Sequence, residues 1–139
     1  MAHRQQSSPR TTATKTHWSV MAASHIATGK LGEQLAVAHL RRDGMRILDR
    51  NWACPIGELD IVAKDGSTVV FCEVKTRRSL RFGTPFGAID ADKARRIDRL
   101  AYAWRRSTNQ WRLRRRFDAV CIVINPDQMA HIDHRRGVF

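Results

Sequence analysis

The chain has 139 residues, of which 42% are hydrophobic and 27% charged, so it suits one globular domain and not a disordered chain. Its 25 lysines and arginines outnumber 13 acids, and a formal charge of +12 favours a polyanionic partner, nucleic acid before an anionic membrane surface. No stretch approaches the ~20 apolar residues of a membrane-spanning helix, and three cysteines without C-x-x-C spacing argue against a disulfide framework or structural zinc and for a reducing cytoplasm.

Residues 1–28 hold three basic residues and no acid, and they show neither a helical nor a strand period. We expect a disordered basic tail there, followed by a single domain over 29–139. A signal peptide is the alternative, but its only apolar stretch, 18–26, is broken by serines and a histidine. Met21 is a second possible start of the protein.

From Gly29 onward the hydrophobic pattern predicts two helices and four or five strands. Gly44 is a helix stop, and the Asp-Gly pair within 64–67 is a hairpin turn between two strands. The order α-β-β-β-α-β-(β) predicts an α/β fold. The expected helices are 30–43 and 90–106, and the expected strands are 45–52, 57–63, 68–76, 117–124 and a short edge strand at 129–133, with a loop at 77–89.

The residues suited to chemistry lie on the two strands of that hairpin. Alternation along a strand places Glu58 and Asp60 on one face of the first, and Glu73 and Lys75 on one face of the second. With the turn centred at 65–66, we expect Asp60 beside Phe71 and Glu58 beside Glu73, in one patch.

Carboxylates that converge in a half-buried patch repel one another unless a cation neutralises them. Mg²⁺ or Mn²⁺ takes oxygen ligands of this kind, and a lysine beside the ion can orient water and stabilise charge on a phosphate. The spacing of Glu73 and Lys75 alone also fits a solvated strand end. Asp60 on the partner strand favours a metal site with Asp60 and Glu73 as ligands and Glu58 as a possible additional acid.

Two helical residues face the same region by their spacing. Glu33 lies on the apolar stripe of the first helix, where it either joins the acidic patch or serves as a favourable charge in the first helical turn. Lys93 heads the apolar stripe of the second helix, where it either reaches a bound phosphate or extends to solvent.

Several short motifs together resemble the YraN family, a small bacterial family assigned to the PD-(D/E)XK nuclease superfamily and similar to archaeal Holliday-junction resolvases. The resemblance covers about 29–133 and implies a restriction-endonuclease-like αβββαβ core with a mixed central sheet flanked by helices. It implies that Asp60 and Glu73 are metal ligands, Lys75 the catalytic lysine and Glu33 the helix-one glutamate of the resolvase-like branch. The motifs are GKLGE at 29–33, NW at 51–52, GELDI at 57–61, FCEVKTR at 71–77, FG at 82–83, Lys93 and RFD at 116–118.

The segment 81–116 carries 11 basic residues and 3 acids, which predicts contacts with the phosphate backbone. No motif for reading bases is present, so we expect recognition of shape and backbone, with Trp104 in the core rather than stacked on bases. The candidate nucleic-acid-binding residues are Arg77, Lys93, Arg95, Arg96 and Arg99.

Three functions fit these observations. The first is a Mg²⁺- or Mn²⁺-dependent DNA endonuclease, acting on branched or damaged DNA and possible as a homodimer. The second is a nucleic-acid-binding module of the same fold without turnover, and the third is a basic protein-interaction domain. His131 and His134 form a weak metal candidate at an exposed terminus, and Cys72 is expected in the core.

Overall fold

The structure, a computed structural model, describes the backbone of residues 11–16, 25–78, 90–127 and 129–139. Within these ranges, the order after β1 is αβββαββ, which confirms the αβββαβ core. The helices are α1 (His25–Arg42) and α2 (Ala91–Thr108), and the strands are β1 (Thr11–Thr16), β2 (Arg46–Cys54), β3 (Gly57–Asp65), β4 (Thr68–Arg77), β5 (Arg114–Ile124) and β6 (Ala130–Arg135).

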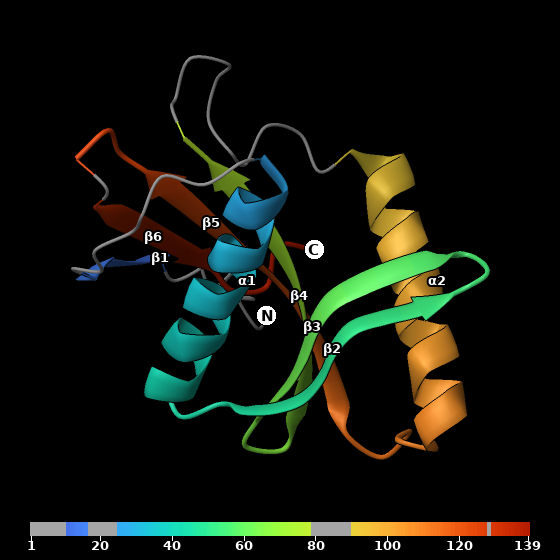
Figure 1. Cartoon of the computed structure of the whole chain (residues 1–139). Coiled ribbons are helices and arrows are strands. Elements are labelled where there is room, and N and C mark those ends of the chain that lie inside the picture. Colours follow the sequence, from blue (N-terminus) through green and yellow to red (C-terminus); the bar gives the residue numbers. More distant parts are fainter. Residues whose placement is uncertain (1–10, 17–24, 79–89, 128) are drawn as a thin grey trace, which may run out of the picture.

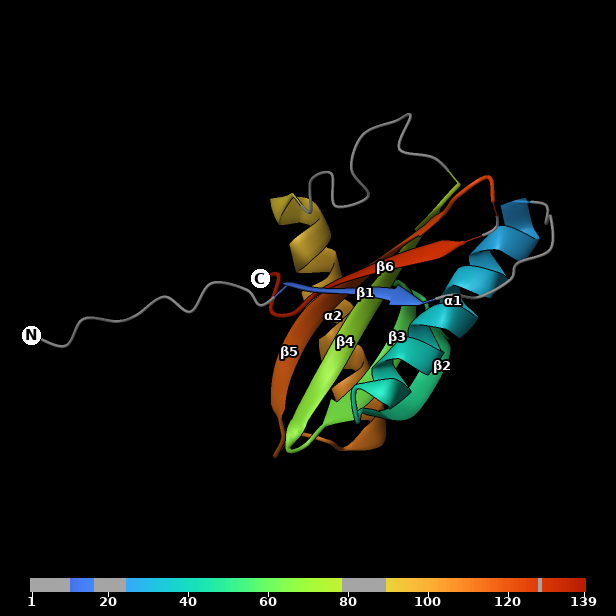
Figure 2. The same cartoon turned by 90° about the vertical axis from the view of Figure 1, so that its left-hand side faces the viewer.

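The strands form one mixed sheet in the order β1-β6-β5-β4-β3-β2. Only β4 and β5 run parallel, and α2 lies in the crossover that such a connection requires. The two helices cover opposite faces of the sheet, α1 one face and α2 the other (Figure 1, Figure 2). This is the α/β architecture with a mixed, helix-flanked sheet that the sequence predicted.

Each helix packs its apolar stripe onto its own face of the sheet. On the α1 face, Leu40 is fully buried against sheet residues such as Val70 and Ile122. On the α2 face, Trp104 is 1% exposed and packs edge-on against Phe71, so the expectation that it belongs to the core is confirmed. Because both faces are covered, β4 is apolar at successive positions until the acidic site begins.

The N-terminal region differs from the expected disordered tail. Thr11–Thr16 forms strand β1, which pairs antiparallel with β6, and α1 begins at His25. β6 is therefore an interior strand and not the expected sheet edge. Four of the six residues of β1 are threonines, which favour extended backbone, but they carry no apolar period that would reveal a strand in the sequence. Residues 1–10 and 17–24, like most of the loop at 77–89, lie outside the described residues.

None of the helices in the described ranges is both long and apolar enough to cross a membrane. The thiols of all three cysteines are free, and Cys72 is 3% exposed within the core beneath α1, as expected.

Candidate active site

The hairpin of β3 and β4 carries the predicted acids, in a register that corrects the expected one. Phe71 pairs with Val62, not with Asp60. Two residues further along, the same register sets Asp60 opposite Glu73, the position that the sequence had assigned to Glu58. Continued one position beyond its last pair, Ile61 with Cys72, this register therefore puts the two predicted metal ligands at facing positions of the two strands.

The reason for the shift lies in the turn. Only Gly66 and Ser67 form it, and Asp65 already pairs with Thr68. Gly66 adopts a φ of +59°, a conformation that glycine takes without strain in a two-residue hairpin turn. The centre of the hairpin is thus one residue later than assumed, and every cross-strand partner moves by two.

The side chain of Asp60 takes the place of a backbone hydrogen-bond acceptor at the point where the pairing of β3 with β4 ends. The last β3–β4 pair is Ile61 with Cys72, and the next amide, that of Val74, donates instead to Asp60 Oδ2 at 2.9 Å. Burial, together with the charges of Glu73, Glu33 and Glu58, raises the pKa of Asp60 to about 6, against the effect of the Val74 hydrogen bond. The other three acids of the prediction therefore converge around Asp60.

Two lysines face Glu73 on the other side. Lys93 Nζ lies 2.8 Å from Glu73 Oε1, and Lys75 Nζ lies 3.7 Å from the same oxygen. The second oxygen, Oε2, is buried and accepts no hydrogen bond within the described structure. Glu73 therefore has one neutralised oxygen and one that lacks a partner, which is an incomplete environment for a carboxylate.

The two lysines differ in protonation behaviour. A hydrogen bond with Lys93 and partial burial lower the pKa of Lys75. Burial opposes the charge of Lys93 as well, but the hydrogen bonds to Glu73 and Lys75 raise the pKa of Lys93 above its usual value. Lys93 is thus the firm ammonium partner of Glu73, while Lys75 is the lysine more ready to give up its proton.

Glu33 reaches this cluster from the first half of α1. Its Oε2 accepts a hydrogen bond of 3.0 Å from Asn51 Nδ2, and Asn51 holds a φ of +50° that asparagine tolerates better than most residues. Gly32 lets the helix lie close to β4, since a Cβ there would come within 1.8 Å of Thr76 Oγ1. Sequence reasoning assigned no role to Asn51, although it lies in one of the family motifs.

A pocket of about 120 Å³ lies where β3, β4 and α2 meet. Glu58, Asp60 and Glu73 line its acidic side, and Arg96 of α2 lines the same pocket. A polar group brought into it would meet carboxylates and a guanidinium together. The remaining apolar lining includes Leu59, Ile97 and Leu100.

The basic candidates divide by what they contact. Arg96 lines the pocket, Arg99 is exposed on α2, and Arg77 is exposed at the end of β4, close enough to Lys75 for its charge to lower the pKa of that lysine. Lys93 instead forms an ion pair with Glu73, so in this structure its ammonium is not free to contact a phosphate. Arg95 is paired with the exposed Asp92.

Part of the basic segment 81–116 supports the fold instead of forming a free surface. Arg116 is bound to Asp118 and Asp65 through its guanidinium nitrogens. Arg105 donates to the carbonyl oxygens of three residues after α2. Nothing in the sequence distinguishes these structural arginines from the exposed arginines of the same segment. Only their contacts in the fold do so. Residues 81–89 of the segment lie outside the described residues.

The donor atoms at Asp60 and Glu73 suit a hard divalent cation. They are carboxylate oxygens, and one of them is buried without a partner within the described structure. Burial and the charges of three neighbouring acids raise the pKa of Asp60, and a bound cation would offset both effects. Across the described ranges, three histidine, cysteine or acidic ligand atoms come within 4.8 Å of one another only at His39, Asp43 and His134. A cation in the pocket would therefore be held by two carboxylates and water, an arrangement common for Mg²⁺.

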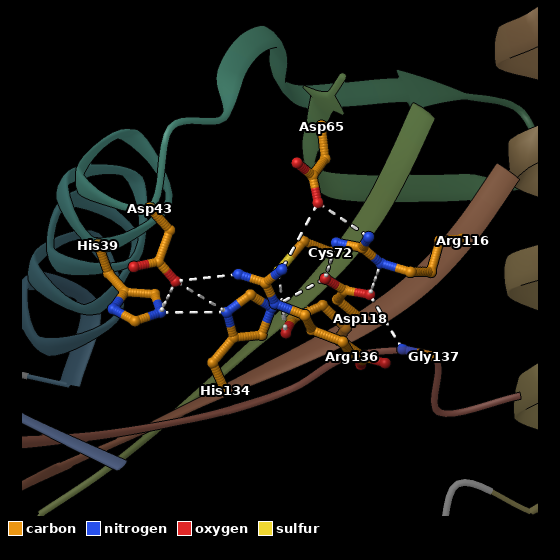
Figure 3. Close-up of polar contacts among 10 residues, drawn as sticks. His39, Asp43, Asp65, Cys72, Arg116, Asp118, His134, Arg136 and Gly137 are labelled. Carbon is orange, nitrogen blue, oxygen red and sulfur yellow. Dashed lines mark hydrogen bonds and ion pairs between the residues drawn. The ribbon is translucent and has the colours of Figure 1, made fainter. Parts of the chain in front are cut away.

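His134 does not lie at an exposed terminus, as the sequence suggested. It is fully buried, and its Nε2 lies 2.8 Å from Asp118 Oδ2 (Figure 3). The pair was missed because one residue comes from β5 and the other from β6, where strand alternation alone does not tell which polar residues meet.

Comparison with known proteins assigns the chain to a family. Residues 32–122 match the model of the uncharacterised protein family UPF0102, the YraN family of the motif resemblance. A UPF0102 protein of Paenarthrobacter aurescens is 50% identical over 110 residues, covering 79% of this chain and 91% of the relative. Those of Renibacterium salmoninarum and Rhodococcus opacus are 48% and 44% identical, covering 81% and 84% of this chain and 96% and 99% of theirs. The chain belongs to the UPF0102 family.

Proposed function

We propose that this member of the UPF0102 family is a metal-dependent endonuclease that hydrolyses phosphodiester bonds of DNA, branched or damaged DNA in particular. The observation that carries the proposal is the position of Asp60. Asp60 faces Glu73 in the strand register, and its pKa is raised to about 6. Lys75 Nζ lies 3.7 Å from Glu73 Oε1, the oxygen that Lys93 also contacts. Paired carboxylates with a lysine beside them suit phosphoryl chemistry.

The roles follow from the contacts. Asp60 and Glu73 would hold Mg²⁺ or Mn²⁺, and the bound ion would supply a Lewis acid that polarises a phosphodiester and acidifies water. Lys75, whose pKa is lowered, can accept or orient the proton of an attacking water and then stabilise negative charge on the phosphate. Asn51 holds Glu33 at the edge of the cluster through a hydrogen bond, and the charge of Glu33 helps raise the pKa of Asp60.

The basic surface would hold the nucleic acid. Arg96 lines the acidic pocket, and Arg77 and Arg99 are exposed near it. A guanidinium binds phosphate oxygens in a bidentate manner without reading bases, so affinity should fall steeply with salt and depend weakly on sequence. A formal charge of +12 supports the same expectation.

The test is cleavage of linear, nicked and four-way-junction DNA with Mg²⁺ or Mn²⁺. Asp60→Asn and Lys75→Met should each lower the cleavage rate by at least about 10³-fold while DNA binding at low salt is kept. Asp98→Asn is the matched control, because Asp98 is an exposed acid paired with Arg115 and should leave cleavage unchanged. Full cleavage by both site variants would refute the assignment.

One observation favours a second function, that of a nucleic-acid-binding module without turnover. Lys93 already supplies a cation to Glu73 at 2.8 Å, so the carboxylate does not depend on a metal for neutralisation. That function predicts salt-dependent DNA binding, no cleavage on any of the three substrates, and no Mg²⁺ binding that Asp60→Asn removes. Calorimetric titration of Mg²⁺ into wild type and Asp60→Asn separates the two functions before any substrate is chosen.

A further inference from the structure

A second group of ligand-type side chains lies under α1, between the end of that helix and β6 (Figure 3). His39 Nε2 lies 3.1 Å from His134 Nδ1, although the two residues are 95 positions apart in the chain. Asp43, one turn after His39, closes the group from the end of the helix. The side chains of His39 and His134 are 2% and 0% exposed, whereas that of Asp43 is 26% exposed.

The separations of the three donor atoms match those around a tetrahedral metal ion. His39 Nε2 and Asp43 Oδ2 are 3.5 Å apart, and His134 Nδ1 and Asp43 Oδ2 are 3.9 Å apart. Ligands about 2.0–2.1 Å from a tetrahedral Zn²⁺ lie roughly 3.3–3.4 Å from one another. The three atoms therefore need to move by only a few tenths of an ångström to bind one ion together.

The far side of His134 is fixed as a metal-binding imidazole usually is. Its Nε2 donates to Asp118 Oδ2 at 2.8 Å. Its Nδ1 is therefore unprotonated, with the lone pair directed at His39 Nε2. Asp118 is itself held by Arg116 at 2.9 and 3.0 Å and by the amide of Gly137 at 3.1 Å. The imidazole can hardly rotate, and its unprotonated nitrogen stays aimed at the centre of the group.

The local charge also admits a divalent cation. Three carboxylates, those of Asp43, Asp65 and Asp118, face two guanidiniums, those of Arg116 and Arg136, in the same network. With neutral imidazoles these five groups carry one net negative charge, and the guanidinium of Arg42 adds a positive charge that acts on His39. Arg136 Nη2 contacts Asp43 Oδ2 at 3.3 Å, a long contact that a ligating carboxylate can exchange for one through its other oxygen.

We propose that His39, Asp43 and His134 form a Zn²⁺ site that fastens the end of α1 to β6, with water as the fourth ligand. Two imidazoles and one carboxylate are borderline donors that suit Zn²⁺ and not Mg²⁺. On binding, the His39–His134 hydrogen bond is lost and His39 carries its proton on Nδ1, so that both ligating nitrogens present lone pairs. The part-exposed carboxylate of Asp43 is the route by which the ion arrives.

The site is separate from the proposed nuclease centre. None of its three ligands lines the pocket of Asp60 and Glu73, and the two sites differ in donor type. Loss of Zn²⁺ binding therefore does not depend on whether the protein cleaves DNA.

The experiment is titration of the full-length, metal-free protein with Zn²⁺ by calorimetry and with Co²⁺ by visible absorption. Wild type should bind one Zn²⁺ and give the intense d–d bands of tetrahedral Co²⁺ without a thiolate charge-transfer band, which excludes the cysteines as ligands. Asp43→Ala should weaken Zn²⁺ binding by at least about tenfold and His39→Gln by more, and in both the rise of Tm with Zn²⁺ should shrink.

Two control variants separate the outcomes. Asp65→Asn alters the same network without removing a ligand and should bind Zn²⁺ like wild type, as should Asp60→Ala. If His39→Gln does not fold, the part-exposed Asp43→Ala carries the test by itself. Wild type without bound Zn²⁺, equal binding by Asp43→Ala, or binding that Asp60→Ala abolishes would each overturn the proposal.

Discussion

Asp60 is half-buried and Asp118 is buried in the same sheet, and their surroundings move their pKa values in opposite directions. Burial and three neighbouring acids raise the pKa of Asp60 to about 6. Burial also acts on Asp118, but hydrogen bonds from His134 and Arg116 outweigh it and lower the pKa of that carboxyl group. At the first site both lysines lie at one oxygen of Glu73 and the other oxygen has no partner within the described structure, while at the second site each oxygen of Asp118 has a partner.

The difference separates a site that needs a ligand from one that stabilises the fold. Burial and the charges of the three neighbouring acids disfavour the ionisation of Asp60. The hydrogen bonds of Asp118 link β5 to β6 and to the amide of Gly137, so this polar network holds the two strands and the segment after β6 together. A residue that lowers the stability of the fold is better explained by a function than by a structural role.

The largest change in the free energy of unfolding is expected for a substitution at Asp118. Asp118→Asn removes the charge that Arg116 and His134 share, so we expect the free energy of unfolding to fall by about 3–5 kcal/mol. Urea denaturation measures it. The exposed pair of Asp98 with Arg115 is the control, where Asp98→Asn should cost less than about 1 kcal/mol. An equal, small loss in both variants would remove the contrast.

Asp60 should behave in the opposite way. Its folded pKa of about 6 lies above the ordinary 3.8, so folding favours its protonated form. Its contribution is fully present below about pH 4 and is lost as the pH rises through 6. Discounted for partial exposure, the loss by pH 7.5 is about 2 kcal/mol. Urea denaturation in EDTA at pH 5 and 7.5 measures about half of that loss, roughly 1 kcal/mol, because the other half occurs below pH 5.

Asp60→Asn serves as the test of that sign. The amide oxygen can still accept the Val74 amide hydrogen bond, but it carries no charge. The variant should be more stable than wild type by about 2 kcal/mol at pH 7.5 and should show a flatter pH dependence between pH 5 and 7.5. A variant that is less stable than wild type at pH 7.5 would mean that Asp60 belongs with Asp118 as a structural acid.

Gly32 tests how closely α1 is held against β4. A Cβ at this position would lie 1.8 Å from Thr76 Oγ1 and 2.9 Å from its Cγ2. Gly32→Ala should therefore cost about 1–3 kcal/mol and move Glu33 away from Asp60. Thr76→Ala removes both atoms, so the double variant should recover part of the loss in thermal denaturation. Additive losses would show that the close approach is not what limits the position.

The smallest effect is expected at Lys93. Its ammonium and Glu73 are both 21% exposed and lie 2.8 Å apart, so Lys93→Met should cost about 1 kcal/mol in metal-free protein. The same change removes the cation that competes for Glu73, and the affinity for Mg²⁺ measured by calorimetry should rise severalfold. Arg95→Met, which breaks only the exposed pair with Asp92, should alter neither quantity. Unchanged Mg²⁺ affinity in Lys93→Met would mean that the lysine does not occupy the cation's place.

Local patterns in the sequence predicted the elements and the site acids. The apolar period of 3.6 gave α1 and α2, the alternation along β3 and β4 put Asp60 and Glu73 on one face, and Asp-Gly marked the turn between them. These features depend on residues a few positions apart. Their geometry is therefore settled by backbone sterics before any tertiary contact forms.

Tertiary packing decided the rest, since it depends on which segments meet. The partner of Asp60 changed from Phe71 to Glu73 because a turn one residue later moves all pairs by two. Arg116 and Arg99 are alike in sequence, yet one binds Asp118 inside the fold and the other is exposed on α2. His39 and His134 meet because α1 packs across β6, and no periodicity within either segment encodes a contact between residues 95 positions apart.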